Sequence, residues 1–172
     1  LTVKNIAMAQ KYFELLVKIK KGESELKISE RTKKFLPDFP KIAITYSVTE
    51  NDEDSQSNRE KMQEAIDYYN QEFDNKFSVD DLVSYNTNVN DRLARKRDRY
   101  KIRSEQLDLI IVVNRLLTGF DAPCLSTLFI DRKPMKPQDL IQAFSRTTVC
   151  LIIIRNMVKL LLSKCLTNSK KL

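Results

Sequence analysis

The chain of 172 residues contains no histidine, three cysteines and only two glycines. Without histidine it lacks the commonest general base and the commonest metal ligand of proteins, and we expect no metal site. The cysteines, Cys124, Cys150 and Cys165, show neither the CxxC spacing of a zinc site nor the pattern of a disulfide framework. This cysteine usage predicts a protein of the reducing cytoplasm.

Glycine is scarce, with Gly22 and Gly119 alone. A phosphate-binding loop of the Walker type needs several glycines followed by Lys and Ser or Thr, and this sequence contains no such run. If the chain acts on a nucleotide, we therefore expect another domain to hold its phosphates.

Long hydrophobic runs are also missing. The longest apolar stretch, residues 149–162, is interrupted by Arg155 and Lys159 and is too short to span a bilayer. The first residues do not have the apolar core and cleavage site of a secretory signal peptide. The sequence therefore predicts no membrane partner.

Positive charge, by contrast, is abundant. The 30 Lys and Arg residues exceed the 23 Asp and Glu residues and give a net charge of +7, which favours a polyanionic partner. The charge is concentrated in residues 91–103, and its basic members are Arg92, Arg95, Lys96, Arg97, Arg99, Lys101 and Arg103. This segment is either a solvated helix face or connector, or a surface that follows nucleic-acid phosphates. In the second interpretation Arg92, Arg95, Lys96 and Arg97 are candidate DNA-binding residues.

The pattern of apolar residues predicts an α/β fold with a mostly parallel sheet. Residues 3–20 and 59–73 have the spacing of amphipathic helices, and residues 137–144 form a further predicted helix that begins with Pro137. Residues 42–47, 107–113 and 128–131 are predicted strands. The apolar run in 107–113 is nearly continuous, as expected of a strand that is buried on both faces.

A first candidate functional segment, Arg-Leu-Leu-Thr-Gly-Phe-Asp-Ala-Pro at 115–123, directly follows this strand. Gly119 permits a tight turn there. Thr118 and Asp121 are then expected at the carboxyl edge of the sheet, where open α/β folds bind ligands. An ordinary exit from a strand uses the same residue types, so the segment alone leaves both interpretations open.

A second candidate segment, residues 138–147, contains Gln142 and Arg146 four positions apart, on one face of a predicted helix. A guanidinium directed at a triphosphate stabilises the charge of a phosphoryl group in transfer. The alternative is a pair of surface residues on an amphipathic helix.

In this order and at this distance, the two segments resemble motifs V and VI of superfamily 2 helicases. Their sequences are similar to those of the type I restriction endonuclease R (HsdR) subunit. The matching runs are Leu-Leu-Thr-Gly-Phe-Asp-Ala-Pro and Gln-Ala-Phe-Ser-Arg-Thr. Residues 41–51 resemble the strand that opens the second RecA-like lobe in that family, and the Leu-Ala-Arg-Lys segment at Leu93 resembles a connector. The resemblance covers about residues 1–148. It implies an N-terminal helical segment (1–36), part of RecA-like motor domain 2 (37–148) and an aberrant tail (149–172).

The resemblance implies a mechanism that is shared between domains. ATP lies between two RecA-like lobes, and Arg146 corresponds to the arginine finger, with Gln142 preceding it on the cleft face. Thr118 and Gly119 correspond to positions near the DNA backbone, and Asp121 to one nearer the nucleotide. ATP and Mg²⁺ are then cofactors of the full-length parent only, and we expect this fragment to bind neither and to be inactive alone.

The implied partners are double-stranded DNA, an upstream RecA-like lobe and a nuclease domain of the same subunit, and the methyltransferase (M) and specificity (S) subunits. Two alternatives to a motor fragment stay open. The chain is a stand-alone module for binding nucleic acid or another partner, or it is a non-functional remnant of a disrupted gene.

The sequence departs from the family after Thr147. Motif VI should carry a second arginine three positions after Arg146, where this chain has Val149. We hypothesise a reading-frame shift in the codon for position 148. With one base restored, the tail from Arg146 onward can encode RTNRMFNYNKEYGQIVTF, which returns the second arginine and adds a turn and a strand. The loss of that strand predicts an open sheet edge. The alternative is a genuine amphipathic terminal helix.

Overall fold

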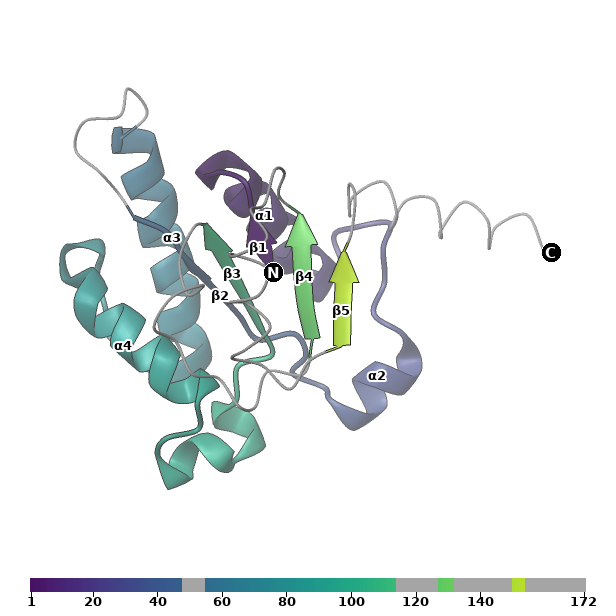
Figure 1. The fold of residues 1–172 in the computed structure, drawn as a ribbon. Coiled ribbons are helices and arrows are strands. Elements are labelled where there is room, and N and C mark those ends of the chain that lie inside the picture. Colours follow the sequence, from purple (N-terminus) through teal and green to yellow (C-terminus); the bar gives the residue numbers. More distant parts are fainter. Residues whose placement is uncertain (48–54, 114–126, 132–149, 154–172) are drawn as a thin grey trace.

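The computed structural model describes residues 1–47, 55–113, 127–131 and 150–153, and these residues form one parallel sheet with helices packed on it (Figure 1). The strands are β1 (Thr2–Val3), β2 (Ile42–Thr45), β3 (Leu109–Val113), β4 (Thr127–Asp131) and β5 (Cys150–Ile153). Their order across the sheet is β2-β3-β1-β4-β5, and every pairing is parallel. This is the architecture of a RecA-like α/β lobe, as predicted.

Within the described ranges, four helices connect or flank these strands: α1 (Ile6–Lys21), α2 (Glu30–Phe35), α3 (Ser55–Phe73) and α4 (Leu82–Leu93). Short 3-10 turns occupy η1 (Val79–Asp81), η2 (Asp98–Lys101) and η3 (Arg103–Glu105). α1 begins where the Asn5 side chain accepts a hydrogen bond from the Met8 amide, which satisfies one free donor of the first turn. α1 and α3 pack together through the edge-to-face rings of Phe13 and Tyr68, 5.5 Å apart.

The core lies between the sheet and these helices. All four residues of β2 are buried, as are the central residues of β3. α3 contributes one buried stripe at helical spacing, namely Met62, Ala65, Ile66, Tyr69 and Phe73. The apolar spacing in the sequence therefore indicated the buried face of α3 correctly.

α4 covers the edge strand of the sheet. The Lys41 carbonyl accepts hydrogen bonds from the amides of Asp108 and Leu109, on the side of β3. Because successive carbonyls of a strand point to alternate sides, the Ile44 carbonyl points to the free edge of β2. There it accepts a hydrogen bond of 2.8 Å from the Tyr85 hydroxyl of α4. An unpaired carbonyl that would otherwise offer this edge to another strand is thus satisfied.

Most predicted elements are confirmed. Strands occur within 42–47, 107–113 and 128–131, and helices occur within 3–20 and 59–73. Val3, which we expected to begin a helix, lies instead in β1. β1 sits between β3 and β4, so residues 1–36 supply a central strand and a packed helix of the same lobe. The predicted helix 137–144 lies outside the described residues.

We expected the loss of the family's next strand to leave an open sheet edge, with the apolar tail either repacked or prone to aggregation, and the structure has a strand of the tail paired in the sheet. Cys150–Ile153 pairs with β4 in parallel, with Thr127 opposite Cys150 and Ile130 opposite Ile153. The tail thus supplies a strand at this position, although its sequence lacks a clean strand alternation. Elsewhere in the described part of the chain, no helix has both the length and the apolar character that a membrane span requires.

Candidate nucleic-acid interface

The predicted site residues fall into two groups. Thr118, Gly119, Asp121, Gln142 and Arg146 lie outside the described residues, so their predicted roles stay predictions. The second group, Arg92, Arg95, Lys96 and Arg97, is described. It belongs to the basic segment, by which we mean residues 91–103, from the end of α4 through η2 to the first residue of η3.

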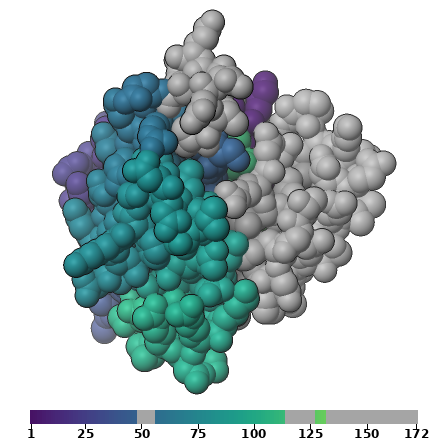
Figure 2. Space-filling model, turned by 90° about the vertical axis from the view of Figure 1, so that its left-hand side faces the viewer, coloured from purple at the N-terminus to yellow at the C-terminus, as the bar shows by residue number. Residues whose placement is uncertain are grey.

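The basic segment lies at the end of the molecule where the strands begin. It leads through η3 into the first residue of β3 and forms the lower end of the molecule in Figures 1 and 2. Residues 114–126 instead follow Val113, at the carboxyl end of β3. β3 is five residues long, or roughly 15 Å. The two groups of predicted DNA contacts therefore start from opposite edges of the sheet.

Arg92 does not belong to an exposed basic surface. Its side chain is 1% exposed, and its guanidinium lies 4.0 Å from the centroid of the Phe73 ring and 4.8 Å from that of Tyr100. Nη1 donates to the Glu105 carboxylate at 2.7 Å, and Nε donates to the Asn88 side chain at 3.1 Å. The prediction that Arg92 contacts DNA is corrected, because its donors are directed at partners inside the protein.

Tyr100 holds the basic segment from within. Its ring is buried, and its hydroxyl accepts hydrogen bonds from Asn88 of α4 at 3.2 Å and from Arg99 at 2.9 Å. The Arg99 guanidinium also lies over the ring, 4.8 Å from its centroid. Such cation–π contacts add a modest attraction at exposed sites. Tyr100 was not among the predicted site residues, although an aromatic residue directly after three alternating arginines is a visible signal in the sequence.

Other side chains of the segment are exposed, and most of them have an internal partner. Asp91 pairs with Lys96 at 3.0 Å and with Arg97 at 3.7 Å, and Asp98 pairs with Lys101 at 2.7 Å. The hydrogen bond and the charge of Asp98 raise the pKa of Lys101 above its ordinary value. Exposed pairs of this kind contribute only about 0–1 kcal/mol. A phosphate can therefore replace the Asp98 carboxylate at little cost, whereas the Asp91 carboxylate, which is 13% exposed, competes with phosphate for Lys96 and Arg97.

A network of ion pairs anchors the far end of the segment to the sheet. Arg103 binds both carboxylate oxygens of Asp108, at 2.6 and 2.9 Å, and also binds Asp38 at 2.9 Å. Burial acts to raise the pKa of Asp38, but the hydrogen bonds and charges of Arg103 and Lys41 outweigh it and hold the pKa below its ordinary value. The segment is thus fixed at Tyr100 and at Arg103.

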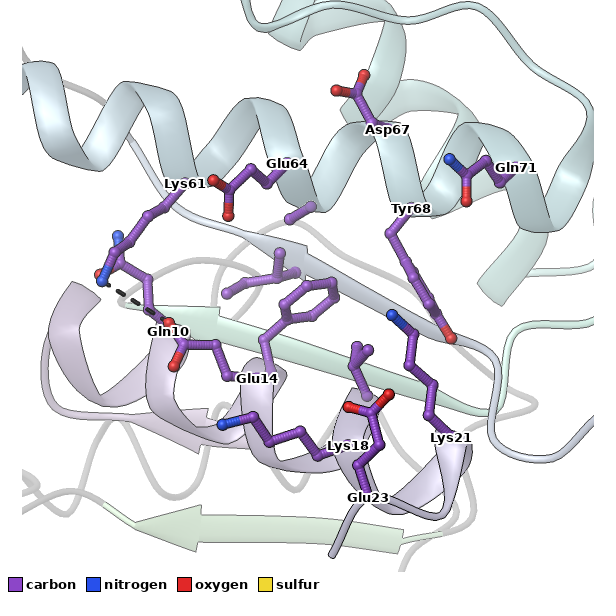
Figure 3. Close-up of a pocket in the computed structure, with 14 residues that line it drawn as sticks. Gln10, Glu14, Lys18, Lys21, Glu23, Lys61, Glu64, Asp67, Tyr68 and Gln71 are labelled. Atoms are coloured by element: carbon purple, nitrogen blue, oxygen red, sulfur yellow. Dashed lines mark ion pairs between the residues drawn. The ribbon is translucent and has the colours of Figure 1, made fainter.

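A groove of about 440 Å³ between α1 and α3 is a separate feature (Figure 3). Its floor includes Phe13 and Ala65. Its rim carries both signs of charge, and Lys61 of α3 reaches Glu14 of α1 at 3.7 Å across it. Because the signs alternate, the groove does not build the single-sign potential that concentrates a polyanion. The basic segment is the better candidate for such a partner.

The parallel sheet and its helices define this chain as a RecA-like lobe, and comparison with known proteins identifies its family. The family model "Type I restriction enzyme subunit R domain 3" matches residues 1–153. The chain belongs to the type I restriction enzyme R subunit family.

Individual relatives agree with this assignment. The chain is 33% identical over 150 residues to the "Type I restriction enzyme SauCOLORF180P endonuclease subunit" of Staphylococcus aureus, a match that covers 85% of the chain and 14% of the relative. It is 34% identical over 147 residues to the SsaAORF53P endonuclease subunit of Staphylococcus saprophyticus, with the same coverage. A match to the HindI endonuclease subunit of Haemophilus influenzae is 48% identical over 48 residues, which are 28% of the chain and 4% of the relative. The chain thus spans about one seventh of the length of the curated relatives that it matches over most of its own length.

Proposed function

We propose that this chain is part of the ATP-dependent DNA-translocating subunit of a type I restriction enzyme, in which it forms the second RecA-like motor lobe (motifs IV to VI). The observation that carries the proposal is the family match over residues 1–153, which includes both motif-like segments. The parallel sheet supports it, because residues 115–123 follow the carboxyl end of a central strand, the usual position of ligand-binding loops in such sheets.

In this proposal the chain acts on ATP that another lobe holds. Arg146 is the arginine finger, and Gln142, four residues earlier in the sequence, precedes it on the cleft face. Asp121 faces the nucleotide, and Thr118 and Gly119 contact the DNA backbone. An arginine finger accelerates phosphoryl transfer by roughly 10³–10⁵-fold, but only opposite bound phosphates. Since the sequence has no phosphate loop, ATP and Mg²⁺ are bound only in the full-length parent, and the chain alone is inactive.

The proposed partners follow from the same role. They are double-stranded DNA, an upstream RecA-like lobe and a nuclease domain of the same subunit, and the methyltransferase and specificity subunits, all in the cytoplasm. Of the basic segment, Arg95, Lys96 and Arg97 are the residues that we assign to DNA phosphates. Arg92 is left out because it is buried.

The test is DNA-stimulated ATP hydrolysis by the full-length subunit carrying Arg146→Ala. We expect the rate to fall at least 10³-fold while ATP binding is retained. The control is Arg31→Ala, which removes an exposed arginine from α2 and should leave the rate unchanged. An Arg146→Ala subunit as active as the wild type would refute the arginine finger.

We further propose that the reading frame shifts after Thr147. The loss of the second motif VI arginine at Val149 supports this, and the family match ends at residue 153. Resequencing of the gene tests it. One base missing at codon 148, followed by codons that yield the RTNRMFNYNKEYGQIVTF continuation, is the expected result. An intact frame whose codons cannot yield it would exclude the shift.

A second candidate function is a stand-alone nucleic-acid-binding module, and a third possibility is a non-functional remnant. The module is favoured by the exposed cations of the basic segment, which need no nucleotide to bind phosphate. The sequence of the gene upstream of Leu1 separates these hypotheses. An open frame with a phosphate loop and an acidic Mg²⁺ motif favours the motor, whereas a nearby stop codon favours the module or the remnant.

A further inference from the structure

Three helices of this lobe end in the same backbone motif. In each, an amide after the helix donates to a carbonyl five residues earlier: Glu23 to Lys18 at 2.9 Å, Asn75 to Asn70 at 3.1 Å, and Lys96 to Asp91 at 3.0 Å. This bond is the signature of the Schellman motif. The residue before each donor adopts a left-handed conformation, with φ of 78° at Gly22, 49° at Asp74 and 50° at Arg95.

The three residues are not equally suited to that conformation. Glycine has no Cβ and adopts positive φ without strain, which is why it predominates at this position. Aspartate tolerates the region because its short polar side chain bonds locally. Arginine has neither property, and its Cβ meets the steric penalty of the left-handed region. α4 therefore ends with a residue that disfavours the backbone conformation required of it.

Apart from the backbone hydrogen bonds of the motif itself, no side-chain contact of Arg95 within the described part of the molecule offsets this strain. Arg95 is exposed and has no acidic partner there. The neighbouring cations each have a partner. Lys96 and Arg97 both pair with Asp91, and Lys101 pairs with Asp98. The Arg99 guanidinium lies over the Tyr100 ring. Arg95 is thus a strained residue whose side-chain donors have no partner among the residues that the structure describes. Strain of this kind is typical of residues that are kept for binding.

We propose that Arg95 is the primary phosphate contact of a DNA-binding loop at the amino edge of the sheet, and that its ligand is the backbone of duplex DNA. Lys96 and Arg97 complete the contact when a phosphate replaces Asp91. The loop is built for this because Tyr100 and Arg103 fix its base while the cations stay exposed. The inference rests on the proposed function, in that the polyanion is the DNA of the motor. It adds a second contact, at the edge of the sheet opposite the carboxyl end of β3.

The experiment compares the complete 172-residue chain with its Arg95→Gly variant, using a fluorescent DNA duplex over a range of salt concentrations. Arg95→Gly relieves the strain and removes the guanidinium, so stability and binding should change in opposite directions. We expect the melting temperature to rise by about 2–4 °C. Duplex affinity should fall about tenfold, and the slope of log K against log salt should become shallower by about 0.9, the value for one lost phosphate contact.

Two matched variants serve as controls. Asp74→Gly places glycine at the corresponding left-handed position after α3, and it should raise the melting temperature by less than Arg95→Gly does, because aspartate tolerates that conformation better, without changing DNA affinity. Lys33→Ala removes one exposed positive charge from α2 and should change the affinity by less than about twofold.

The outcomes distinguish this inference from the proposed function. If the wild type binds duplex DNA and Arg95→Gly binds it equally well, the inference is overturned while the motor proposal stands. If the wild type shows no salt-dependent binding to duplex DNA, the DNA contacts assigned to the basic segment fail as well. Binding to heparin but not to the duplex also overturns these contacts, since it shows only general attraction to polyanions.

Discussion

The guanidinium carbon of Arg92 lies 4.0 Å from the centroid of the Phe73 ring. This contact joins the last turn of α4 to the last residue of α3. The charge is enclosed and paired: Glu105 neutralises it, and Asn88 accepts a hydrogen bond from Nε. A buried cation with satisfied donors is tolerated, whereas one that loses its counter-charge is not. Arg92 thus fixes the point from which the exposed part of the basic segment begins.

Replacement of Arg92 by alanine should destabilise the fold strongly. The change leaves a cavity against Phe73 and strips the Glu105 carboxylate of its partner, and we expect a loss of about 3–5 kcal/mol in the free energy of unfolding. Urea titration followed by circular dichroism measures it. The matched control is Arg97→Ala, an exposed arginine five positions away, which should cost less than about 1 kcal/mol. Equal effects of the two changes would show that burial does not separate these arginines.

The hydroxyl of Tyr85 should stabilise the edge of the sheet. Tyr85→Phe keeps the ring in the core but removes the hydroxyl, which donates a hydrogen bond to the Ile44 carbonyl over 2.8 Å. We expect a loss of about 1–3 kcal/mol, together with faster amide hydrogen exchange in β2. Val83→Ala, at a side chain of α4 that is 79% exposed, is the control and should change stability by less than about 0.5 kcal/mol. Unchanged stability in Tyr85→Phe would mean that water replaces the hydroxyl.

Sequence patterns predicted those elements that are determined by local spacing. The apolar run of β3 and the buried stripe of α3 could be identified because burial of one face repeats along the chain. β1 could not, because two residues carry no period; Thr2 and Val3 form a strand only through pairing with β3 and β4, more than 100 residues away.

In the candidate site, too, some features follow from the local sequence and others depend on contacts that only the fold creates. Arg92 was indistinguishable from its basic neighbours in the sequence, since its burial depends on Phe73, nineteen positions earlier, and on Tyr100. The strain at Arg95 was equally invisible, because helix ends are set by backbone geometry that composition does not specify. Sequence reasoning located the basic segment, but the fold decides which of its cations face solvent.

Acid should weaken the anchor at Asp38. Its pKa is held below the ordinary value in the folded protein by Arg103 and Lys41, against the opposing effect of burial. A lowered folded pKa contributes stability above the unfolded pKa of about 3.9, and this contribution is lost as the pH falls through the folded value. Asp38→Asn should therefore have a lower melting temperature than the wild type at pH 7, and the two should converge at acid pH, once the pH has fallen below the pKa of Asp38 in the folded protein.

Thermal unfolding between pH 7 and pH 2 checks this dependence. Asp67→Asn, on the exposed side of α3, is the control, and its difference from the wild type should stay small throughout. A constant gap between Asp38→Asn and the wild type over the whole range would show that the Asp38 side chain acts by packing, and not by its charge.

Asp91 should act as an internal competitor for phosphate. Its side chain is 13% exposed and lies 3.0 Å from Lys96 and 3.7 Å from Arg97, so it neutralises two of the cations that we assign to DNA. Asp91→Asn removes this charge, and we expect duplex affinity to rise about three- to tenfold at low salt, with the gain shrinking as salt screens the charges. Glu30→Gln, which releases Lys33 on α2, matches the change in net charge and should leave the affinity nearly unchanged. A fall in affinity for Asp91→Asn would have a different meaning: the carboxylate would then position Lys96 and Arg97 for the phosphate, and its replacement would disorder the contact.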